Sequence, residues 1–144
     1  MKSLSIIYKA GCWSFILVGL GHIVTSMFVP ITPERASIIL EMKNFSITMA
    51  GTESNLYLFH EGFSLMMGVL LISYGLLNLF LTKASVIPEN NIIFINTTVS
   101  LIAFIISIKY FFMVPIILLC IAFLCFLITL IISTKPVIHS KEKQ

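Results

Sequence analysis

The feature that most constrains this chain is a long apolar run from Asn55 to Thr82, which reads NLYLFHEGFSLMMGVLLISYGLLNLFLT. About 20 apolar residues in a helix, at 1.5 Å per residue, span the hydrocarbon core of a bilayer. The run is somewhat longer than this minimum, so it predicts one transmembrane helix. We expect the rest of the chain to be organised around this helix.

The composition of the whole chain agrees with a membrane protein. Of its 144 residues, 58% are hydrophobic and only 10% are charged, and the mean hydropathy is +1.07. Soluble domains carry roughly a quarter charged residues. The net charge of +3 is small and dispersed, so we expect no nucleic-acid partner.

Three further apolar runs are long enough to cross a bilayer, and proline or charged residues separate all four. The basic start of the first run resembles a signal peptide, but the run continues to Val29 and no small-x-small site follows it, so no cleavage is expected. The sequence predicts an all-α integral membrane four-helix bundle, formed as a single domain by residues 1–144. The predicted spans are about 8–29, 55–82, 91–108 and 114–133, followed by a polar tail at 134–144.

The connection at residues 30–54 is the longest one and contains its own helix signal. Thr32, Pro33 and Glu34 provide an N-cap, a proline at the first helical position and an acid in the first turn. We predict a short amphipathic helix of about 13 residues that lies on the bilayer surface or caps the bundle. Gly51 is expected to break the chain before the next span. The charged residues of this segment are Glu34, Arg35, Glu41, Lys43 and Glu53.

The distribution of basic residues predicts the orientation. One side of the predicted bundle carries Lys2, Lys9, Lys83, Lys135, Lys141 and Lys143. The other side carries Arg35, Lys43 and Lys109. Cytoplasmic connections are enriched in Lys and Arg, so the sequence predicts a multi-pass protein of the inner (plasma) membrane with both termini in the cytoplasm.

Small and polar residues in the 55–82 helix follow one stripe at helical spacing. The stripe consists of Glu61, Ser64, Gly68, Gly75 and Asn78. In lipid, such a stripe marks the face that packs against other helices, because small residues allow backbones to approach and polar residues find partners. An ionisable residue within a span is also a candidate functional residue, which draws attention to Glu61.

Two histidines are predicted to lie at a similar depth to Glu61. His22 is near the outer end of the first span, and His60 is near the start of the second, which runs antiparallel to it. A structural role is one interpretation, in which His22 donates to a backbone group or to Glu61. A second is a binding site for haem iron or a divalent metal, with the helix at 32–45 covering it. A third is a proton or small-solute path that continues through Ser64 and Asn78.

No motif of a known catalytic class is visible. The sequence contains no GxSxG, no HExxH and no glycine-rich phosphate loop. The three cysteines lie in apolar runs without CxxC spacing, so they predict neither a zinc site nor a disulfide framework. The sequence therefore favours a protein without catalytic chemistry and without a bound cofactor.

A set of short motifs between residues 15 and 80 resembles those of a family of small, uncharacterised four-span bacterial membrane proteins. The motifs are Gly19 with His22, Met42-Lys43-x-Phe45, Gly51, and Glu61-Gly62-Phe63-Ser64-Leu65 at the start of a span. The resemblance implies a four-span fold in the bacterial envelope and no particular reaction. The topology is also similar to that of DoxX-like four-span proteins, for which a redox role has been suggested.

The functional expectation is therefore an accessory or interaction subunit of the bacterial inner membrane. Its partners would be the lipid bilayer and either another membrane protein or a second copy in a homodimer. The first alternative is a haem-, metal- or quinone-linked redox protein that uses His22, His60 and Glu61. The second alternative is a small transporter subunit.

Overall fold

The computed structural model describes residues 2–28, 30–82 and 86–134 of the chain. Its elements, in chain order, are α1 (Lys2–Phe28), α2 (Pro33–Asn44), β1 (Ser46–Met49), β2 (Thr52–Asn55), α3 (Leu56–Leu81), α4 (Asn90–Tyr110) and α5 (Met113–Ser133). Four of these helices, α1, α3, α4 and α5, are long and apolar enough to cross a membrane. The predicted all-α membrane protein with four spans is thus confirmed.

The long helices begin and end within two residues of the predicted spans, except at the start of α1. This helix begins at Lys2 and contains 27 residues, whereas the sequence predicted a start near residue 8. At 1.5 Å per residue it is about 40 Å long, which exceeds the ~30 Å hydrocarbon core. The helix therefore extends beyond the apolar segment that the prediction detected. Val29 lies outside the described residues, as do residues 135–144 of the predicted tail.

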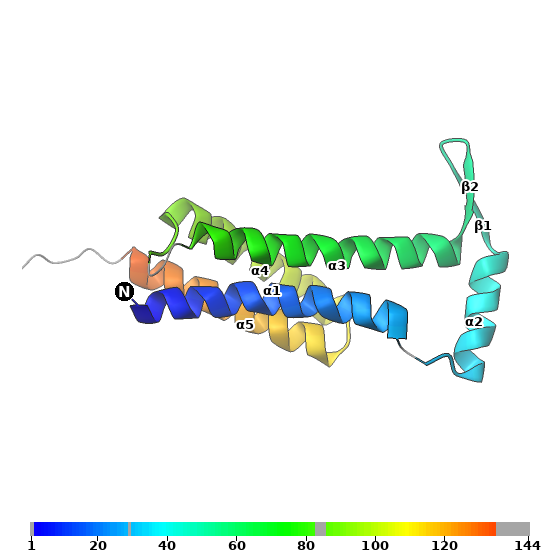
Figure 1. Ribbon diagram of the computed structural model, residues 1–144, viewed down its shortest axis with the longest axis horizontal. Coiled ribbons are helices and arrows are strands. Elements are labelled where there is room, and N and C mark those ends of the chain that lie inside the picture. Colours follow the sequence, from blue (N-terminus) through cyan, green and yellow to red (C-terminus); the bar gives the residue numbers. More distant parts are fainter. Residues whose placement is uncertain (1, 29, 83–85, 135–144) are drawn as a thin grey trace, which may run out of the picture.

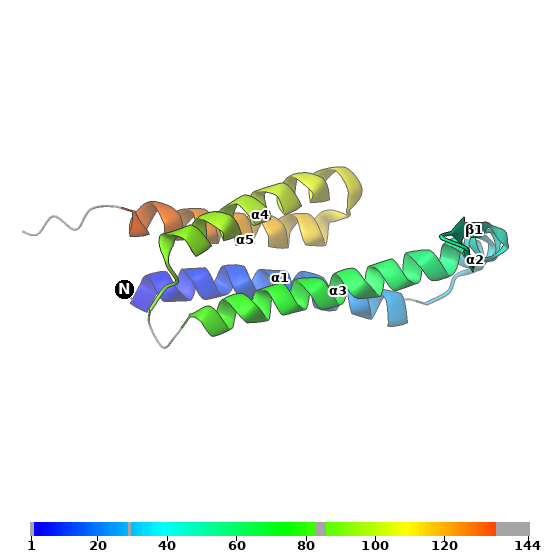
Figure 2. The same ribbon diagram turned by 90° about the horizontal axis from the view of Figure 1, so that it is seen from above.

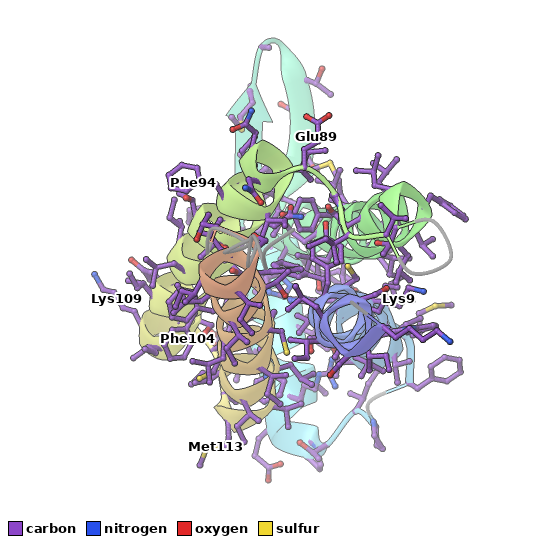
Figure 3. The ribbon with its side chains drawn as sticks, turned by 90° about the vertical axis from the view of Figure 1, so that its left-hand side faces the viewer. Lys9, Glu89, Phe94, Phe104, Lys109 and Met113 are labelled. Atoms are coloured by element: carbon purple, nitrogen blue, oxygen red, sulfur yellow. The ribbon has the colours of Figure 1, made fainter. Side chains whose placement is uncertain are left out.

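The long helices run side by side, and α2 and the two strands lie beyond one end of them (Figure 1). We call this end the loop end, and we call the opposite end, where the N-terminus and the end of α5 lie, the terminal end. Helix α1 is central, because it packs against both α3 and α5, while α4 packs mainly on α5. The view along the helices shows the order α3, α1, α5, α4 (Figure 3), and α4 diverges from α3 toward the loop end (Figure 2).

Glycines bring α1 and α3 into backbone contact. A Cβ atom added to Gly19 would lie 2.6 Å from the carbonyl oxygen of Gly68, and one added to Gly75 would lie 2.7 Å from the carbonyl oxygen of Cys12. Small residues at such positions are the usual means by which membrane helices approach each other closely. The stripe predicted for α3 is therefore a packing face, with Gly68, Gly75 and Asn78 buried against α1.

A two-stranded hairpin that was not predicted from the sequence precedes α3. Strands β1 and β2 pair antiparallel, with Met49 opposite Thr52. Ala50 and Gly51 form the two-residue turn with φ angles of 50° and 80°, as a type I′ turn requires. The expectation that Gly51 only interrupts the chain before the second span missed this turn. The only available signal was Gly51 itself, because β1 has just two β-branched residues, Ile47 and Thr48, and β2 is polar.

The turn provides a first testable prediction. Ala50 adopts a left-handed conformation that costs a residue with a Cβ atom roughly 1–2 kcal/mol, and Asn tolerates this conformation better. We therefore expect Ala50→Asn to stabilise the hairpin by up to about 1 kcal/mol. Slower amide hydrogen exchange in residues 46–55 would measure this effect, and Ala36→Asn in α2 is the control that should not produce it. Faster exchange in Ala50→Asn would contradict the turn geometry.

Helix α2 has the predicted position and cap. The Thr32 side chain accepts a hydrogen bond from the backbone N–H of Arg35 at 3.3 Å. The helix lies across the direction of the long helices (Figure 1), and none of its residues is buried. It packs against the start of α3 and against β2. It thus lies beside the loop end, on the start of α3, and does not cover the bundle interior.

Candidate functional site

The structure brings together two of the five predicted site residues at the loop end of the α1–α3 contact. The imidazole Nδ1 of His22 is 3.5 Å from the Ser64 hydroxyl oxygen. The Ser26 hydroxyl donates to the same oxygen at 3.1 Å. The His22 ring also meets Phe111 edge-on, with 5.6 Å between the ring centroids. His22 is therefore held by α3 on one side and by the end of α4 on the other.

His60 and Glu61 do not join this group. His60 is exposed, and it lies four residues before Ser64, or about 6 Å farther toward the loop end. Glu61 is partly buried. Neither side chain forms a hydrogen bond or an ion pair within the described part of the chain. Over the same residues, no group of three His, Cys, Asp or Glu side chains is placed to hold a metal ion.

The fifth predicted residue, Asn78, belongs to a polar cluster near the terminal end. We call this cluster the Tyr–Asn cluster; it consists of Tyr8 in α1, Tyr74 and Asn78 in α3, and Asn96 in α4. The Tyr8 hydroxyl donates to Asn78 Oδ1 at 2.9 Å. The Asn96 amide donates to Asn78 Oδ1 at 2.6 Å and to the Tyr8 hydroxyl at 2.7 Å. The cluster therefore links three spans at one point.

The remaining polar atoms of the Tyr–Asn cluster are paired as well. The Tyr74 hydroxyl donates to Asn96 Oδ1. The Asn78 amide donates to the Tyr74 backbone carbonyl at 3.0 Å. Across the described residues, no buried side-chain nitrogen or oxygen lacks a partner. Its hydrogen bonds join α1, α3 and α4, and a buried network whose members are paired in this way rigidifies the packing of the helices.

The sequence contained part of the signal for this cluster. Asn78 belongs to the stripe predicted for the 55–82 helix, where a polar side chain is expected to find a partner in another helix. Its meeting with Asn96 could not be predicted, because α3 and α4 have little other contact and the packing order of the four spans is not encoded in any local pattern. Tyr8 lies near the end of its span and is nevertheless completely buried.

A cavity opens on the side of His22 that faces α5. It has a volume of about 250 Å³. The residues that line it come from the loop-end halves of α1 and α5 and from the α4–α5 turn: Leu17, Val18, Gly21, His22, Thr25, Phe112, Val114, Pro115 and Leu118. Val18 and Pro115 are buried and form its floor, whereas Leu17 and Phe112 are exposed at its rim. The cavity therefore opens to the outer surface of the bundle.

The charged residues predicted for the long connection lie at its surface. Glu34, Glu41, Lys43 and Glu53 are exposed, and Arg35 is partly buried. The backbone N–H of Glu34 and the Thr32 hydroxyl hold the pKa of the Glu34 carboxyl below its ordinary value. The Lys43 ammonium lies 5.1 Å from the centroid of the Tyr57 ring, which ties the end of α2 to the start of α3.

Comparisons of the chain with protein-family models, with curated proteins and with solved structures found no match. Its function is therefore inferred from its residues and their geometry.

Proposed function

We propose that this protein is an accessory subunit of the bacterial inner membrane, with both termini in the cytoplasm, and that it binds a partner membrane protein through its loop-end segment. This segment comprises α2 and the hairpin, residues 33–55. The four spans would act as its membrane anchor and support. The resemblance to small four-span bacterial membrane proteins supports the assignment to the bacterial envelope.

The observation that carries this proposal is the exposure of large apolar side chains throughout the loop-end segment. Ile38, Leu40, Phe45 and Met49 are each between 57% and 61% exposed. Five charged residues occur in the same segment (Glu34, Arg35, Glu41, Lys43 and Glu53), so this surface differs from the uninterrupted apolar faces of the spans. Exposed apolar side chains rimmed by polar residues are typical of a protein or membrane interaction site.

The hydrogen bonds of the polar residues in the spans support a role without catalytic chemistry. The Tyr–Asn cluster satisfies its own hydrogen bonds. The other buried hydroxyls in the spans, such as those of Thr97, Ser100 and Thr129, donate to backbone carbonyls of their own helix. Catalysis requires groups that are placed to act on a substrate, and these groups already have structural partners.

The basic residues support the proposed orientation. Among the described residues, Lys2 and Lys9 belong to the terminal end, whereas Arg35, Lys43 and Lys109 belong to the loop end, where Lys109 points away from the bundle (Figure 3). Lys83, Lys135, Lys141 and Lys143 lie outside the described residues, so the larger cytoplasmic count rests on the sequence. An excess of Lys and Arg on the terminal side favours a cytoplasmic position for that side.

Site-specific photocrosslinking in native membranes tests the proposal. A photoreactive amino acid at Phe45 or Met49 should give one discrete, higher-mass adduct with another protein. The same amino acid at Phe80, which is 77% exposed near the terminal end, is the control and should crosslink only to lipid. Adducts of equal yield at Phe80 would contradict a dedicated loop-end surface. Crosslinks from Phe45 to lipid alone would show that the segment lies on the membrane without a protein partner.

A further inference from the structure

We propose that the cavity between α1 and α5 is a binding site for an uncharged, lipid-like amphipath, whose carbonyl oxygen accepts a hydrogen bond from Nε2 of His22. This site is independent of the loop-end segment and assigns the protein a lipid-binding activity. The shape of the cavity, the hydrogen-bond donor of His22 and the absence of charge in the lining each restrict which molecule can bind.

The shape and position of the cavity restrict the occupant to a molecule that enters from the bilayer. The volume of about 250 Å³ is at the small end of the range for ligand sites, so it suits a head group or part of one chain. Most of its lining is aliphatic or aromatic. It lies at the loop-end halves of α1 and α5, and its rim residues Leu17 and Phe112 face lipid.

His22 supplies a hydrogen-bond donor to this cavity. Ser26 donates to the Ser64 hydroxyl oxygen, so the Ser64 proton is available for Nδ1 of His22. In the tautomer in which Nδ1 accepts this proton, the imidazole proton lies on Nε2 and is free to donate. Nε2 has no partner among the described residues, where every buried side-chain nitrogen has one. Nε2 is therefore accessible, and the cavity is the space that His22 lines.

The charge of the lining restricts the head group. None of the nine lining residues is Lys, Arg, Asp or Glu. A carboxylate or phosphate in this apolar space would lack a countercharge, which carries a large desolvation penalty. A neutral carbonyl needs only one donor, and Nε2 supplies it. The structure therefore favours an ester-bearing neutral lipid over a fatty acid or a phospholipid head.

Photolabelling of the purified full-length protein in dodecyl maltoside, a detergent without a carbonyl, tests this site. The probe is a monoacylglycerol with a diazirine in its acyl chain, and the matched probe is the alkyl ether that lacks only the carbonyl. A diazirine fatty acid provides the charged comparison. Intact-mass spectrometry measures the labelled fraction, and peptide mapping locates the label. Unlabelled monoacylglycerol serves as the competitor.

We expect saturable labelling near Leu17 and Leu118. The ester probe should bind about three- to tenfold more tightly than the ether, because one neutral hydrogen bond contributes about this much to affinity. Gly21→Leu should fill the cavity and reduce labelling at least tenfold. An added Cβ at Gly21 meets no atom within 4 Å, so the variant should fold. Gly62→Leu on α3 has the same free space and is its control.

His22→Phe should abolish the preference for the ester over the ether, whereas His60→Phe should retain it. This pair keeps the test decisive even if Gly21→Leu fails to fold. Equal labelling of wild type and a folded Gly21→Leu would overturn the site. Equal affinity of ester and ether in the wild type would overturn the role of His22, and tighter binding of the fatty acid would overturn the neutral head group.

Discussion

Gly19→Leu is expected to cause the largest loss of stability, about 3 kcal/mol or more in the free energy of unfolding. Its Cβ would lie 2.6 Å from the Gly68 carbonyl oxygen and 3.0 Å from the Ile72 backbone nitrogen. Backbone atoms cannot move aside as a flexible side chain can, so α1 and α3 must separate to admit the leucine. Loss of helical circular dichroism on titration with sodium dodecyl sulfate would measure the change.

The control for this prediction lies two residues away on the same helix. A Cβ atom added to Gly21 would have no atom within 4 Å, and leucine is a better helix former than glycine. Gly21→Leu should therefore unfold at the same detergent fraction as wild type or at a higher one. If Gly19→Leu and Gly21→Leu unfolded together, the contact between the two backbones would not exist in the folded protein.

Asn96→Leu is expected to cause the second largest loss, about 2 kcal/mol. The substitution removes three hydrogen bonds between side chains, to Tyr8, Tyr74 and Asn78. Hydrogen bonds between membrane helices contribute about 0.6 kcal/mol each on average and up to about 1.7 kcal/mol. The same detergent titration measures the effect, because α4 is joined to α1 and α3 chiefly through this residue.

Two further variants test the assignment of this loss to the Tyr–Asn cluster. Thr98→Val on the exposed side of α4 removes a hydroxyl that bonds only to its own helix, so its unfolding should match wild type within about 0.5 kcal/mol. Tyr74→Phe should be partly non-additive with Asn96→Leu, because both remove the same hydrogen bond. Full additivity would show that the two side chains do not interact.

Much of the fold was predictable because a bilayer imposes simple rules on a chain. The apolar length of each span and the proline and charged residues between spans predicted four helices, and the structure contains them. The stripe through Gly68, Gly75 and Asn78 predicted the face of α3 that packs. The hairpin was missed because its strands have four residues each and weak alternation. Its signal depended on a single two-residue turn.

The candidate site was less predictable, because it depends on which spans are neighbours. The predicted depth of His22 in its helix placed it level with the start of α3. The contact between His22 and Ser64 agrees with that depth. The same argument from depth placed His60 near His22. Two side chains at one depth are in contact only if each points toward the other helix, and the His60 side chain is exposed. The cavity forms where α1 meets the α4–α5 turn and the start of α5, and no pattern within either helix encodes that packing.

The Tyr–Asn cluster also constrains how the chain enters the membrane during synthesis. Asn78 leaves the ribosome in α3, and Asn96 follows in α4. Asn78 can pair with Tyr8 of α1 as soon as α3 enters, but the partners of the Asn96 side chain all lie in other spans, so Asn96 faces lipid unfavourably until it reaches them. Entry of α3 and α4 into the bilayer as one helical pair would therefore avoid this cost. The insertion machinery would hold the second span beside it until the third arrives, and α5 would complete the assembly by docking on α1.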